Sequence, residues 1–267
     1  MLALVIQNVI NALQWGSFYA LIALGYTLVY GVLTLINFAH GDVFMVGAYI
    51  AFFVATFFLA AMGLPGWVAL ALCIPLTMIL TSMVGVTLER VAYRPLRNKG
   101  AHRLYVVITA LMCGLILQHA NLAFLGASRK AFPPLIQEQV YNVAGVSFTN
   151  LKIAVIVTAF LVFLLLHWVV TKTRVGMAMR AISYDKFAVP LMGVSQDRII
   201  SLTFLLGAGL GAAGGILWGI AFPVLNPYMG LRVGWKAFIA AVVGGIGDIR
   251  GAFLGGLLLG FVEIFVV

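Results

Sequence analysis

The first ninety residues consist of long apolar stretches that are almost free of charge. Between Met1 and Arg90 the formally charged side chains are Asp42 and Glu89 alone. An α-helix of about 20 apolar residues crosses the hydrocarbon core of a bilayer. A charged side chain at the centre of that core costs at least about 2.5 kcal/mol. Such stretches suit lipid better than water, so we expect several membrane-spanning helices.

Composition points the same way, because 64% of the 267 residues are hydrophobic and only 9% are charged. Soluble domains carry about 25% charged residues. Apolar stretches cover about 4–36, 43–62, 67–87, 104–125, 151–170, 199–221 and 235–267. They predict an all-α polytopic membrane protein, a single transmembrane domain over 1–267 with about seven transmembrane helices, some discontinuous. The first stretch is long for one perpendicular span, so we expect a tilt, a kink or a break in it.

The positive charges gather in two loops, at about 89–103 and 171–198, within a chain of net charge +9. Short loops rich in Lys and Arg stay on the cytoplasmic side of a membrane. Both loops are therefore predicted to be cytoplasmic, and the N-terminus extracytoplasmic. A nucleic-acid partner is disfavoured because we expect no soluble basic domain to bind it. We also expect no cleavable signal peptide, so that the first stretch stays as a span.

Sequence signatures of enzymes are missing. The chain has no H-E-x-x-H, G-x-S-x-G or G-x-x-x-x-G-K-[ST] pattern. Cys73 and Cys113 lie in apolar segments, and the four histidines have no metal-ligand spacing. We therefore expect no catalytic residue, no metal site and no cofactor in this chain. If the protein transports with ATP, the ATPase must be a separate chain.

Two short polar or glycine-rich segments interrupt the apolar stretches and are candidates for a substrate path. The first supplies Asn37, Phe38, His40, Gly41 and Asp42, and the second supplies Gly244, Gly245, Gly247 and Asp248. Non-helical backbone at membrane depth is tolerated where it lines a cavity or is buried in protein. Paired breaks of this kind mark substrate paths in transporters. The alternative, that both are ordinary turns in water, stays open. Asp248 and Arg250 are expected to pair locally or to contact water.

Glycines recur every four residues in the sixth apolar stretch. They are Gly207, Gly211, Gly215 and Gly219, and they share one helical face. Small residues at this spacing let a neighbouring backbone approach closely. Helix packing is the favoured interpretation, and the lining of a permeation path is compatible with it.

The second basic loop, 171–198, mixes apolar and charged residues. Gly176–Ala188 includes good helix formers, and Pro190 with Gly193 is expected to end the run. Short helices in a long cytoplasmic loop suit docking to a cytoplasmic partner. The alternative is a loop whose charge serves only to set membrane topology.

Five motifs in chain order resemble the permease subunits of high-affinity branched-chain amino acid ABC importers, the LivH-like family. The first motif is Tyr19–Gly31 with Ile36–Asp42, and the second is Glu89–Arg97. The third consists of Arg180-Ala181, Asp185, Met192–Val194 and Asp197-Arg198. The fourth is Asn226–Gly230, and the fifth runs from Lys236–Phe238 through Gly244–Gly247. The similarity runs along nearly the whole chain. Five motifs in one order are far more specific than any single one of them.

The resemblance implies a subunit of a larger importer in a bacterial or archaeal cytoplasmic membrane. Its partners would be a second permease chain, homologous or identical, two cytoplasmic ATPase subunits that bind ATP-Mg, and an extracytoplasmic solute-binding protein. Arg180, Ala181, Asp185 and Gly193 would belong to the ATPase coupling loop, where Pro190 is expected to shorten the coupling helix. Relatives usually continue through another span, so the final family span is expected to be missing here.

The sequence therefore predicts a permease that works by alternating access, with branched-chain amino acids as the leading substrate. Urea, short amides and other amino acids stay open as substrates. A secondary transporter or channel explains the broken apolar stretches equally well, although it would not need a docking loop. A structural membrane scaffold is disfavoured by the two interrupted segments.

Overall fold

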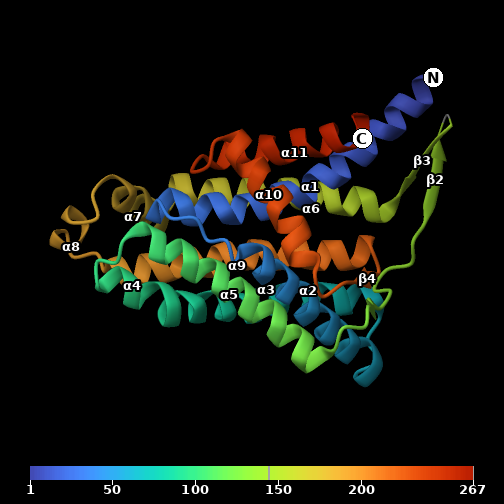
Figure 1. The fold of residues 1–267 in the computed structure, drawn as a ribbon. Helices are drawn as coiled ribbons and strands as arrows, with labels where there is room; N and C mark the ends of the chain where they lie inside the picture. Colours follow the sequence, from blue (N-terminus) through green and yellow to red (C-terminus); the bar gives the residue numbers. More distant parts are fainter. Residues whose placement is uncertain (144, 267) are drawn as a thin grey trace.

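The computed structural model describes residues 1–143 and 145–266, and the chain is largely helical (Figure 1). The helices are α1 (Leu2–Leu33), α2 (His40–Thr56), α3 (Gly66–Leu88), α4 (Arg94–Asn98), α5 (Arg103–Leu125), α6 (Asn150–Lys172), α7 (Arg174–Tyr184), α8 (Ala188–Leu191), α9 (Gln196–Ala221), α10 (Met229–Gly244) and α11 (Ile249–Phe265). Two π-helical turns, η1 (Phe57–Ala61) and η2 (Glu89–Tyr93), extend α2 and α3. The short strands are β1 (Lys130–Ala131), β2 (Val140–Val143), β3 (Val146–Thr149) and β4 (Val224–Leu225).

Six helices in the described part of the chain are long and apolar enough to cross a membrane, which supports the predicted polytopic fold. They cover Leu2–Leu33, His40–Ala61, Gly66–Asn98, Arg103–Leu125, Asn150–Lys172 and Gln196–Ala221. The last apolar region, predicted as a seventh span, is divided into α10 and α11, of 16 and 17 residues. The first stretch forms α1, which runs for 32 residues without a break. At 1.5 Å per residue α1 is about 48 Å long, which exceeds the roughly 30 Å hydrocarbon core.

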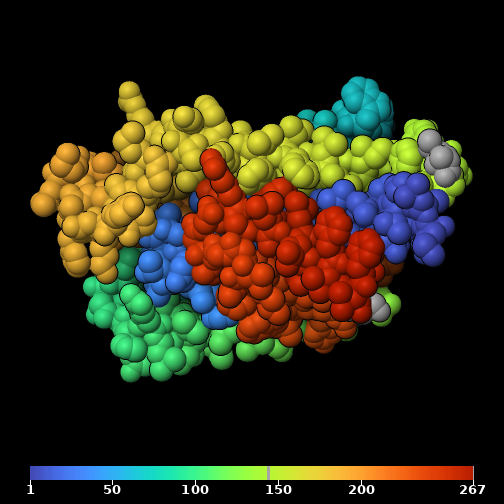
Figure 2. All heavy atoms as spheres, turned by 90° about the horizontal axis from the view of Figure 1, so that it is seen from above, coloured from blue at the N-terminus to red at the C-terminus, as the bar shows by residue number. Residues whose placement is uncertain are grey.

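Helices α1 and α9 form the centre of the bundle, because most of their residues are buried, whereas α3, α5 and α6 are more exposed. Small residues allow this central packing. Gly256 of α11 lies directly on Ala20 of α1, where an added Cβ would be 2.3 Å from the Ala20 Cα atom. Gly260 lies equally close to the Gly16 backbone. In Figure 2 the red α11 lies over the blue α1, which emerges on both sides of it.

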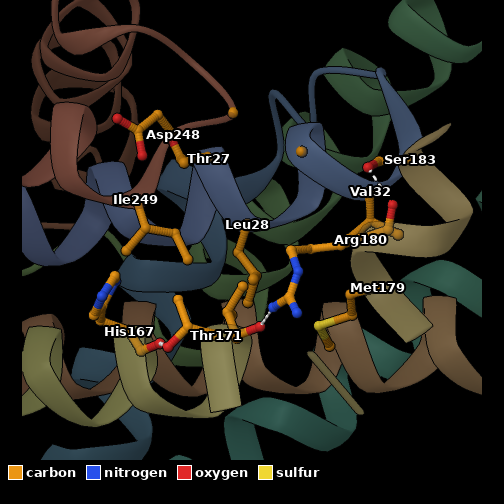
Figure 3. A pocket seen from close by; sticks show the side chains of 13 residues that line it. Thr27, Leu28, Val32, His167, Thr171, Met179, Arg180, Ser183, Asp248 and Ile249 are labelled. Atoms are coloured by element: carbon orange, nitrogen blue, oxygen red, sulfur yellow. Dashed lines mark hydrogen bonds between the residues drawn. The ribbon is translucent and has the colours of Figure 1, made fainter. Parts of the chain in front are cut away.

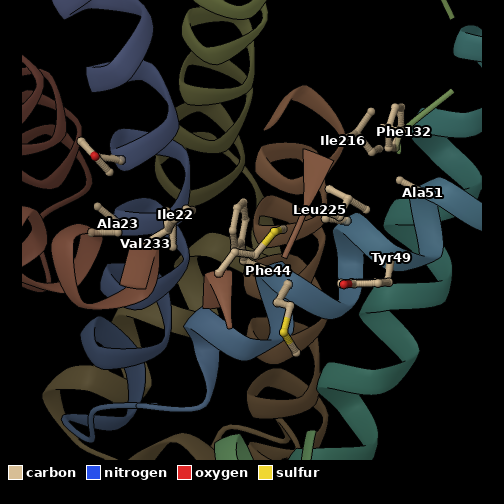
Figure 4. Close-up of a cluster of buried hydrophobic side chains, with 14 of the residues drawn as sticks. Ile22, Ala23, Phe44, Tyr49, Ala51, Phe132, Ile216, Leu225 and Val233 are labelled. Carbon is tan, nitrogen blue, oxygen red and sulfur yellow. The ribbon is translucent and has the colours of Figure 1, made fainter. Parts of the chain in front are cut away.

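The largest apolar core lies where α2 meets α1, α9 and α10. Phe44, Ile22, Ile216 and Val233 are buried in it, together with Leu225 of β4 (Figure 4). These side chains come from elements that are far apart in the chain. The core therefore holds α2 and α10, which have 17 and 16 residues, against the two central spans.

The loop between α5 and α6 contributes to two small sheets. Strands β2 and β3 form an antiparallel hairpin. Strand β1 pairs with β4, so that Lys130 stands opposite Leu225. The Phe132 N–H also donates to the Pro223 carbonyl at 3.0 Å. This pairing joins the outer loop to the segment that precedes α10.

Both basic loops lie at the opposite end of the bundle, where Figure 1 shows α4, α7 and α8. Their common position agrees with the prediction that 89–103 and 171–198 face the same side. The N-terminus lies at the other end, beside the β2–β3 hairpin. We therefore describe the end with α7 as cytoplasmic and the end with the hairpin as outer.

A charge cluster joins the end of α3 to the start of α9 at the cytoplasmic end. The fully buried Glu89 carboxylate pairs with the guanidinium groups of Arg94 at 2.8 Å and Arg97 at 3.2 Å. Arg97 also pairs with Asp197 of α9, and the Ser201 hydroxyl donates to Glu89 at 2.8 Å. The buried carboxylate thus has charged and polar partners from two helices, as a buried charge requires.

Candidate substrate path

The first predicted break is only partly non-helical. Residues 34–39 connect α1 to α2, whereas His40, Gly41 and Asp42 form the first turn of α2. The connection is anchored by a side chain. The Tyr93 hydroxyl donates to the Asn37 amide oxygen at 2.6 Å, and both residues are buried. This end of α2 is therefore enclosed in protein.

Aromatic contacts hold the start of α2 between α1 and α10. The centroid of the Phe38 ring lies 5.6 Å from that of Trp235 and 5.3 Å from that of Phe238, both in α10. The His40 ring packs edge-on against Tyr26 of α1 at 4.9 Å. Such aromatic pairs add to the stabilisation that burial alone provides. They fix the position of the first turn of α2.

The Asp42 carboxyl group is buried between two glycines. A Cβ added to Gly114 of α5 would lie 2.5 Å from Oδ2, and one added to Gly230 of α10 would lie 2.8 Å from Oδ1. Gly114 stands halfway along α5 (Arg103–Leu125), so Asp42 lies near the middle of that span. Within the described part of the chain, Asp42 Oδ1 has no hydrogen-bond partner. Buried polar atoms are nearly always satisfied, so this oxygen is a candidate to bind a donor from a ligand.

Helix α10 begins beside the start of α2. An added Cβ on Gly41 would meet the Gly230 carbonyl at 2.6 Å and the Gly234 Cα atom at 2.8 Å, so the two backbones are in direct contact. In Figure 1 both helices start within the bundle and not at its ends. A helix N-terminus carries a partial positive charge. The two N-termini therefore offset part of the cost of placing a carboxyl group here.

A cavity of about 260 Å³ lies at this meeting point. Its polar wall comes from Tyr26, Asp42 and Gln118, and its apolar wall includes Leu115 of α5 and Trp235 of α10. The volume is close to the lower limit of small-molecule sites, roughly 300 Å³. We call this space the Asp42 cavity. Its lining suits a small solute with one polar end and one apolar end.

The residues predicted at the first break divide into two groups. Phe38, Gly41 and Asp42 line the Asp42 cavity. Asn37 and His40 lie behind that lining, where Asn37 binds Tyr93 and His40 packs on Tyr26. The first group therefore borders the cavity, and the second group packs behind it.

The second predicted break lies elsewhere in the fold. Helix α10 ends at Gly244, and Gly245 and Gly247 then turn the chain with φ angles of 96° and 105°, which glycine adopts readily. The Gly247 carbonyl lies against Gly31 of α1, near the cytoplasmic end of that helix. The two breaks are thus separate in space. The α10 glycines that face the first break are in its first turns, not in its last one.

The turn between α10 and α11 lines a different cavity, of about 230 Å³, at the cytoplasmic end (Figure 3). Within the described residues, Asp248 and Arg250 form no ion pair with each other. Asp248 caps α11 by accepting from the backbone N–H groups of Arg250 and Gly251, each at 3.2 Å. The Arg250 guanidinium lies 3.2 Å from His167 Nε2 of α6. Asp248 and Arg250 are both exposed, so they contact water at this end.

The predicted coupling loop folds into α7 and α8. Helix α7 ends at Tyr184, and the Asp185 side chain then accepts from the backbone N–H of Ala188 at 3.1 Å. The helix expected through Ala188 is therefore shorter, and it ends at Tyr184, before Pro190 is reached. Pro190 lies within the four-residue α8, and Gly193 follows with a φ of 77°.

Arg180 reaches back from α7 toward α6 and does not extend away from the bundle (Figure 3). Its guanidinium donates to the Val170 carbonyl near the end of α6, and it lines the cytoplasmic cavity with Met179 and Ser183. Ala181, the next residue, is exposed. Arg180 therefore joins α7 to the end of α6.

Four large apolar side chains are exposed on and around α8. Tyr184, Phe187, Leu191 and Met192 are 93%, 77%, 86% and 82% exposed. They belong to the segment that extends beyond the ends of α6 and α9 in Figure 1. We call this surface the coupling patch. Large apolar side chains gathered on a surface outside the membrane are typical of a protein-binding site.

The four regularly spaced glycines of α9 contact several different elements. Gly207 faces Gly25 of α1, Gly211 faces the His40 ring, Gly215 faces the backbone of Ala48 in α2, and Gly219 faces the Phe132 ring. At Gly215 an added Cβ would lie 2.7 Å from the Ala48 nitrogen. The row therefore lies in the seam between α9 and its neighbours.

Sequence reasoning did not assign three glycines around Asp42 to the path. Gly230 and Gly234 could have been predicted as a close helix contact, because they are four residues apart and follow Asn226-Pro227 at the start of an apolar run. Gly114 could not, since it is an isolated glycine inside a predicted span. Its role depends on the packing of α5 against α2, which one sequence does not reveal.

Comparison with known proteins gives a consistent result. A family model described as "Branched-chain amino acid transport system / permease component" matches residues 8–267. The chain is 43% identical to the high-affinity branched-chain amino acid transport system permease protein BraD of Pseudomonas aeruginosa, over 97% of this chain and 85% of that protein. It is 40% identical to the corresponding permease protein LivH of Escherichia coli, over 97% and 84%.

A more distant relative comes from an archaeon. The probable branched-chain amino acid transport permease protein LivH of Methanocaldococcus jannaschii is 28% identical over 95% of this chain and 78% of that protein. No solved structure matches the chain. The family match at residues 8–267 includes both breaks and the coupling loop. The chain belongs to the family of permease components of branched-chain amino acid transport systems.

Proposed function

We propose that this chain is the transmembrane permease subunit of an ATP-driven importer of branched-chain amino acids. The observation that carries the proposal is the family membership over residues 8–267, together with identities of 40% and 43% to permeases named for these substrates. Six apolar spans and a cavity within the bundle support the same function. The protein is a multi-pass component of the cytoplasmic membrane.

The Asp42 cavity is proposed as part of the substrate path. Asp42 would bind the ammonium group of the amino acid, while Leu115 and Trp235 would face its branched side chain. The close contact of Gly41 with Gly230 couples the starts of α2 and α10. A relative movement of these two short helices would change the shape of the cavity, which is how alternating access exposes one site to each side in turn.

The energy for transport is proposed to come from ATP hydrolysis in separate chains. Two cytoplasmic ATPase subunits would bind and hydrolyse ATP-Mg, a second permease chain would complete the membrane part, and an extracytoplasmic solute-binding protein would deliver the substrate. The coupling patch around α8 suits the contact with an ATPase subunit, because it is apolar and exposed. Arg180 would pass the movement of α7 to α6 through the Val170 carbonyl.

The test is uptake of radiolabelled leucine by proteoliposomes that contain the complete importer. We expect uptake that needs both ATP on the cytoplasmic face and loaded binding protein on the outer face. Urea and acetamide serve as competing substrates in the same vesicles, and binding of leucine by the soluble binding protein is measured separately. Preference for urea or a short amide would replace the substrate assignment and keep the importer.

A secondary transporter is the candidate of another class. In that case this chain alone would accumulate solute along an ion gradient, and ATP would have no effect. Vesicles that contain only this chain are therefore measured with and without a sodium or proton gradient. ATP-independent uptake by this chain alone would overturn the proposal of an ATP-driven importer.

A further inference from the structure

A third cavity, of about 300 Å³, lies between α1, α9 and α10. Its walls include Trp15 and Tyr19 of α1, Trp218 of α9, and Arg232 and Lys236 of α10. None of the residues predicted for the substrate path lines it. The cavity combines two cationic side chains with large aromatic rings, and we call it the Arg232 cavity.

The Arg232 cavity extends well below the outer surface of the bundle. Lys152, at the start of α6, donates to the Asn11 side chain at 2.7 Å, and we take the outer end of the span on α1 to lie here because a charged group is costly deeper in the bilayer. Tyr19 is two helical turns further along α1, or about 12 Å deeper. The charged groups beside Tyr19 are thus at membrane depth, where an ionisable side chain normally has a functional role.

Two of the charged groups at the cavity compensate each other. The Lys236 ammonium donates to Glu263 of α11 at 2.5 Å, and the Tyr19 hydroxyl donates to the other carboxylate oxygen at 2.6 Å. Lys236 also lies over the Tyr19 ring, 5.8 Å from its centroid. This ion pair is close to neutral as a whole, so its presence in the membrane needs no ligand.

Arg232 is different, because it has no ion-pair partner among the described residues. Its side chain is exposed at the cavity, one helical turn before Lys236 on the same face of α10. A guanidinium that faced hydrocarbon would cost at least about 2.5 kcal/mol. Arg232 must therefore face water or an anionic ligand, and together with the Lys236–Glu263 pair it leaves the cavity with a net positive charge.

The remaining walls are aromatic. The Trp15 ring lies 5.5 Å from the Trp218 ring and 6.1 Å from the Tyr19 ring, measured between centroids. Large aromatic side chains offer apolar surface that an aliphatic group can cover. An aliphatic side chain can therefore pack here while a carboxylate reaches the guanidinium.

The faces of α10 separate the Arg232 cavity from the Asp42 cavity. Gly230 and Gly234 line the Asp42 cavity, whereas Arg232 and Lys236 line the other one. Residues four apart lie on one helical face, so the two pairs occupy two different faces. One short helix therefore borders both spaces, with an unpaired cation on one side and the unsatisfied carboxyl oxygen of Asp42 on the other.

From this geometry we infer that the Arg232 cavity is a binding station for an aliphatic amino acid, with Arg232 as the residue that binds its carboxylate. The inference rests on the proposed import function and adds a site to it. Arg suits the role because its planar guanidinium forms two parallel hydrogen bonds to a carboxylate. The Trp15 and Trp218 rings contact the aliphatic side chain.

The test compares three arginine variants of the complete importer in proteoliposomes. Arg232→Gln removes the charge, Arg232→Lys keeps it, and Arg90→Gln makes the same change at an exposed cytoplasmic position as a matched control. Leucine uptake and ATP hydrolysis stimulated by loaded binding protein are measured in the same vesicles. We expect Arg232→Gln to lower uptake about tenfold, which is about 1.4 kcal/mol, while stimulated hydrolysis is unchanged.

The control and the lysine variant determine how the result is interpreted. Arg90→Gln should leave both rates unchanged, and Arg232→Lys should recover part of the uptake. Uptake by Arg232→Gln at the wild-type rate would overturn the inference. A parallel loss of uptake and stimulated hydrolysis in both Arg232 variants would assign a structural role to this residue and overturn it as well.

An anionic lipid headgroup is another source of negative charge for Arg232. The same variants are therefore measured in vesicles of phosphatidylcholine alone and in vesicles that also contain phosphatidylglycerol. A defect that occurs only with the anionic lipid would assign the site to lipid and overturn the inference. Absence of leucine uptake by the wild-type importer would count against the proposed function, whereas normal wild-type uptake with an unaffected Arg232→Gln would count against this site alone.

Discussion

At the scale of single residues, the packing of the bundle depends on glycines, which have no side chain and so let neighbouring helices approach closely. The four regularly spaced glycines of α9 can be compared directly, because an added Cβ would meet close backbone atoms at some of them and more distant atoms at others. An added Cβ on Gly215 would lie 2.7 Å from the Ala48 nitrogen and 2.9 Å from the Phe44 carbonyl, both backbone atoms. On Gly211 the nearest atom would be 3.4 Å away, in the His40 ring, which is an ordinary contact.

We therefore expect Gly215→Ala to destabilise the protein by about 1–3 kcal/mol, as overpacking of a well-packed interior does. The matched variant Gly211→Ala should have little effect, since alanine is otherwise favourable in a helix. Thermal unfolding of both variants in one detergent measures the difference. Equal melting temperatures for the two would contradict the packing role of the α9 seam.

Asp42 provides a test of the proposed substrate path at the same scale. Asp42→Asn keeps the size of a side chain that fits between Gly114 and Gly230, and it removes the charge offered to an ammonium group. We expect leucine uptake to fall about tenfold or more, as for the loss of a charge-assisted hydrogen bond. The melting temperature should stay near that of the wild type. Glu138→Gln in the exposed outer loop is the control, and unchanged uptake by Asp42→Asn would remove Asp42 from the path.

At the scale of elements, the charge cluster at Glu89 joins α3 and α4 to α9. The Glu89 carboxylate is fully buried and binds Arg94 and Arg97, which are themselves partly exposed. Glu89→Gln leaves Arg94 without a counter-charge and leaves Arg97 with Asp197 alone. We expect a loss of stability of about 1.5–3 kcal/mol, the range for a hydrogen bond to a charged group.

Glu138→Gln is again the control for this substitution, because Glu138 is exposed and has no ion-pair partner among the described residues. Both variants are compared by thermal unfolding at low and at high salt. The Glu89 effect should persist at high salt, because a buried pair is screened weakly. A loss that disappears with salt would place the interaction at the surface.

Most of the elements could be predicted from the sequence, and most of their contacts could not. The length of an apolar stretch and the charge of a loop can be read from one segment alone. They were therefore enough to predict the spans and to predict that both basic loops lie on the same side. The break at Gly244–Asp248 was predicted equally well, but its position against Gly31 of α1 depends on how α11 packs. The contact of Asp42 with Gly230 joins residues far apart in the chain, and no local pattern in one sequence encodes it.

At the scale of the whole molecule, one end of the bundle presents apolar side chains outside the membrane. The coupling patch includes Leu191, which is 86% exposed and contributes little to the packing of this chain. We expect Leu191→Asp to weaken binding of the ATPase subunit by at least about tenfold, because a few well-buried contacts carry most of the energy of an interface. The stability of the permease itself should not change.

Asn98→Asp adds the same negative charge at the same end of the molecule, outside the coupling patch. Co-purification of the ATPase subunit with each variant, and ATP hydrolysis by the purified complexes, measure the effect. Loss of the ATPase subunit from both variants would indicate a general effect of charge. Retention by Leu191→Asp would exclude the patch as the docking surface.

The pairing of β1 with β4 has a mechanical consequence for the outer face. Hydrogen bonds between peptide groups connect the loop after α5 to the chain just before α10, through Lys130 opposite Leu225 and through Phe132 N–H to Pro223. A force applied to that loop from outside is therefore transmitted to the start of α10 along the main chain. Since peptide groups are the same for nearly every amino acid, side chains of this loop can be exchanged while the linkage to α10 is kept.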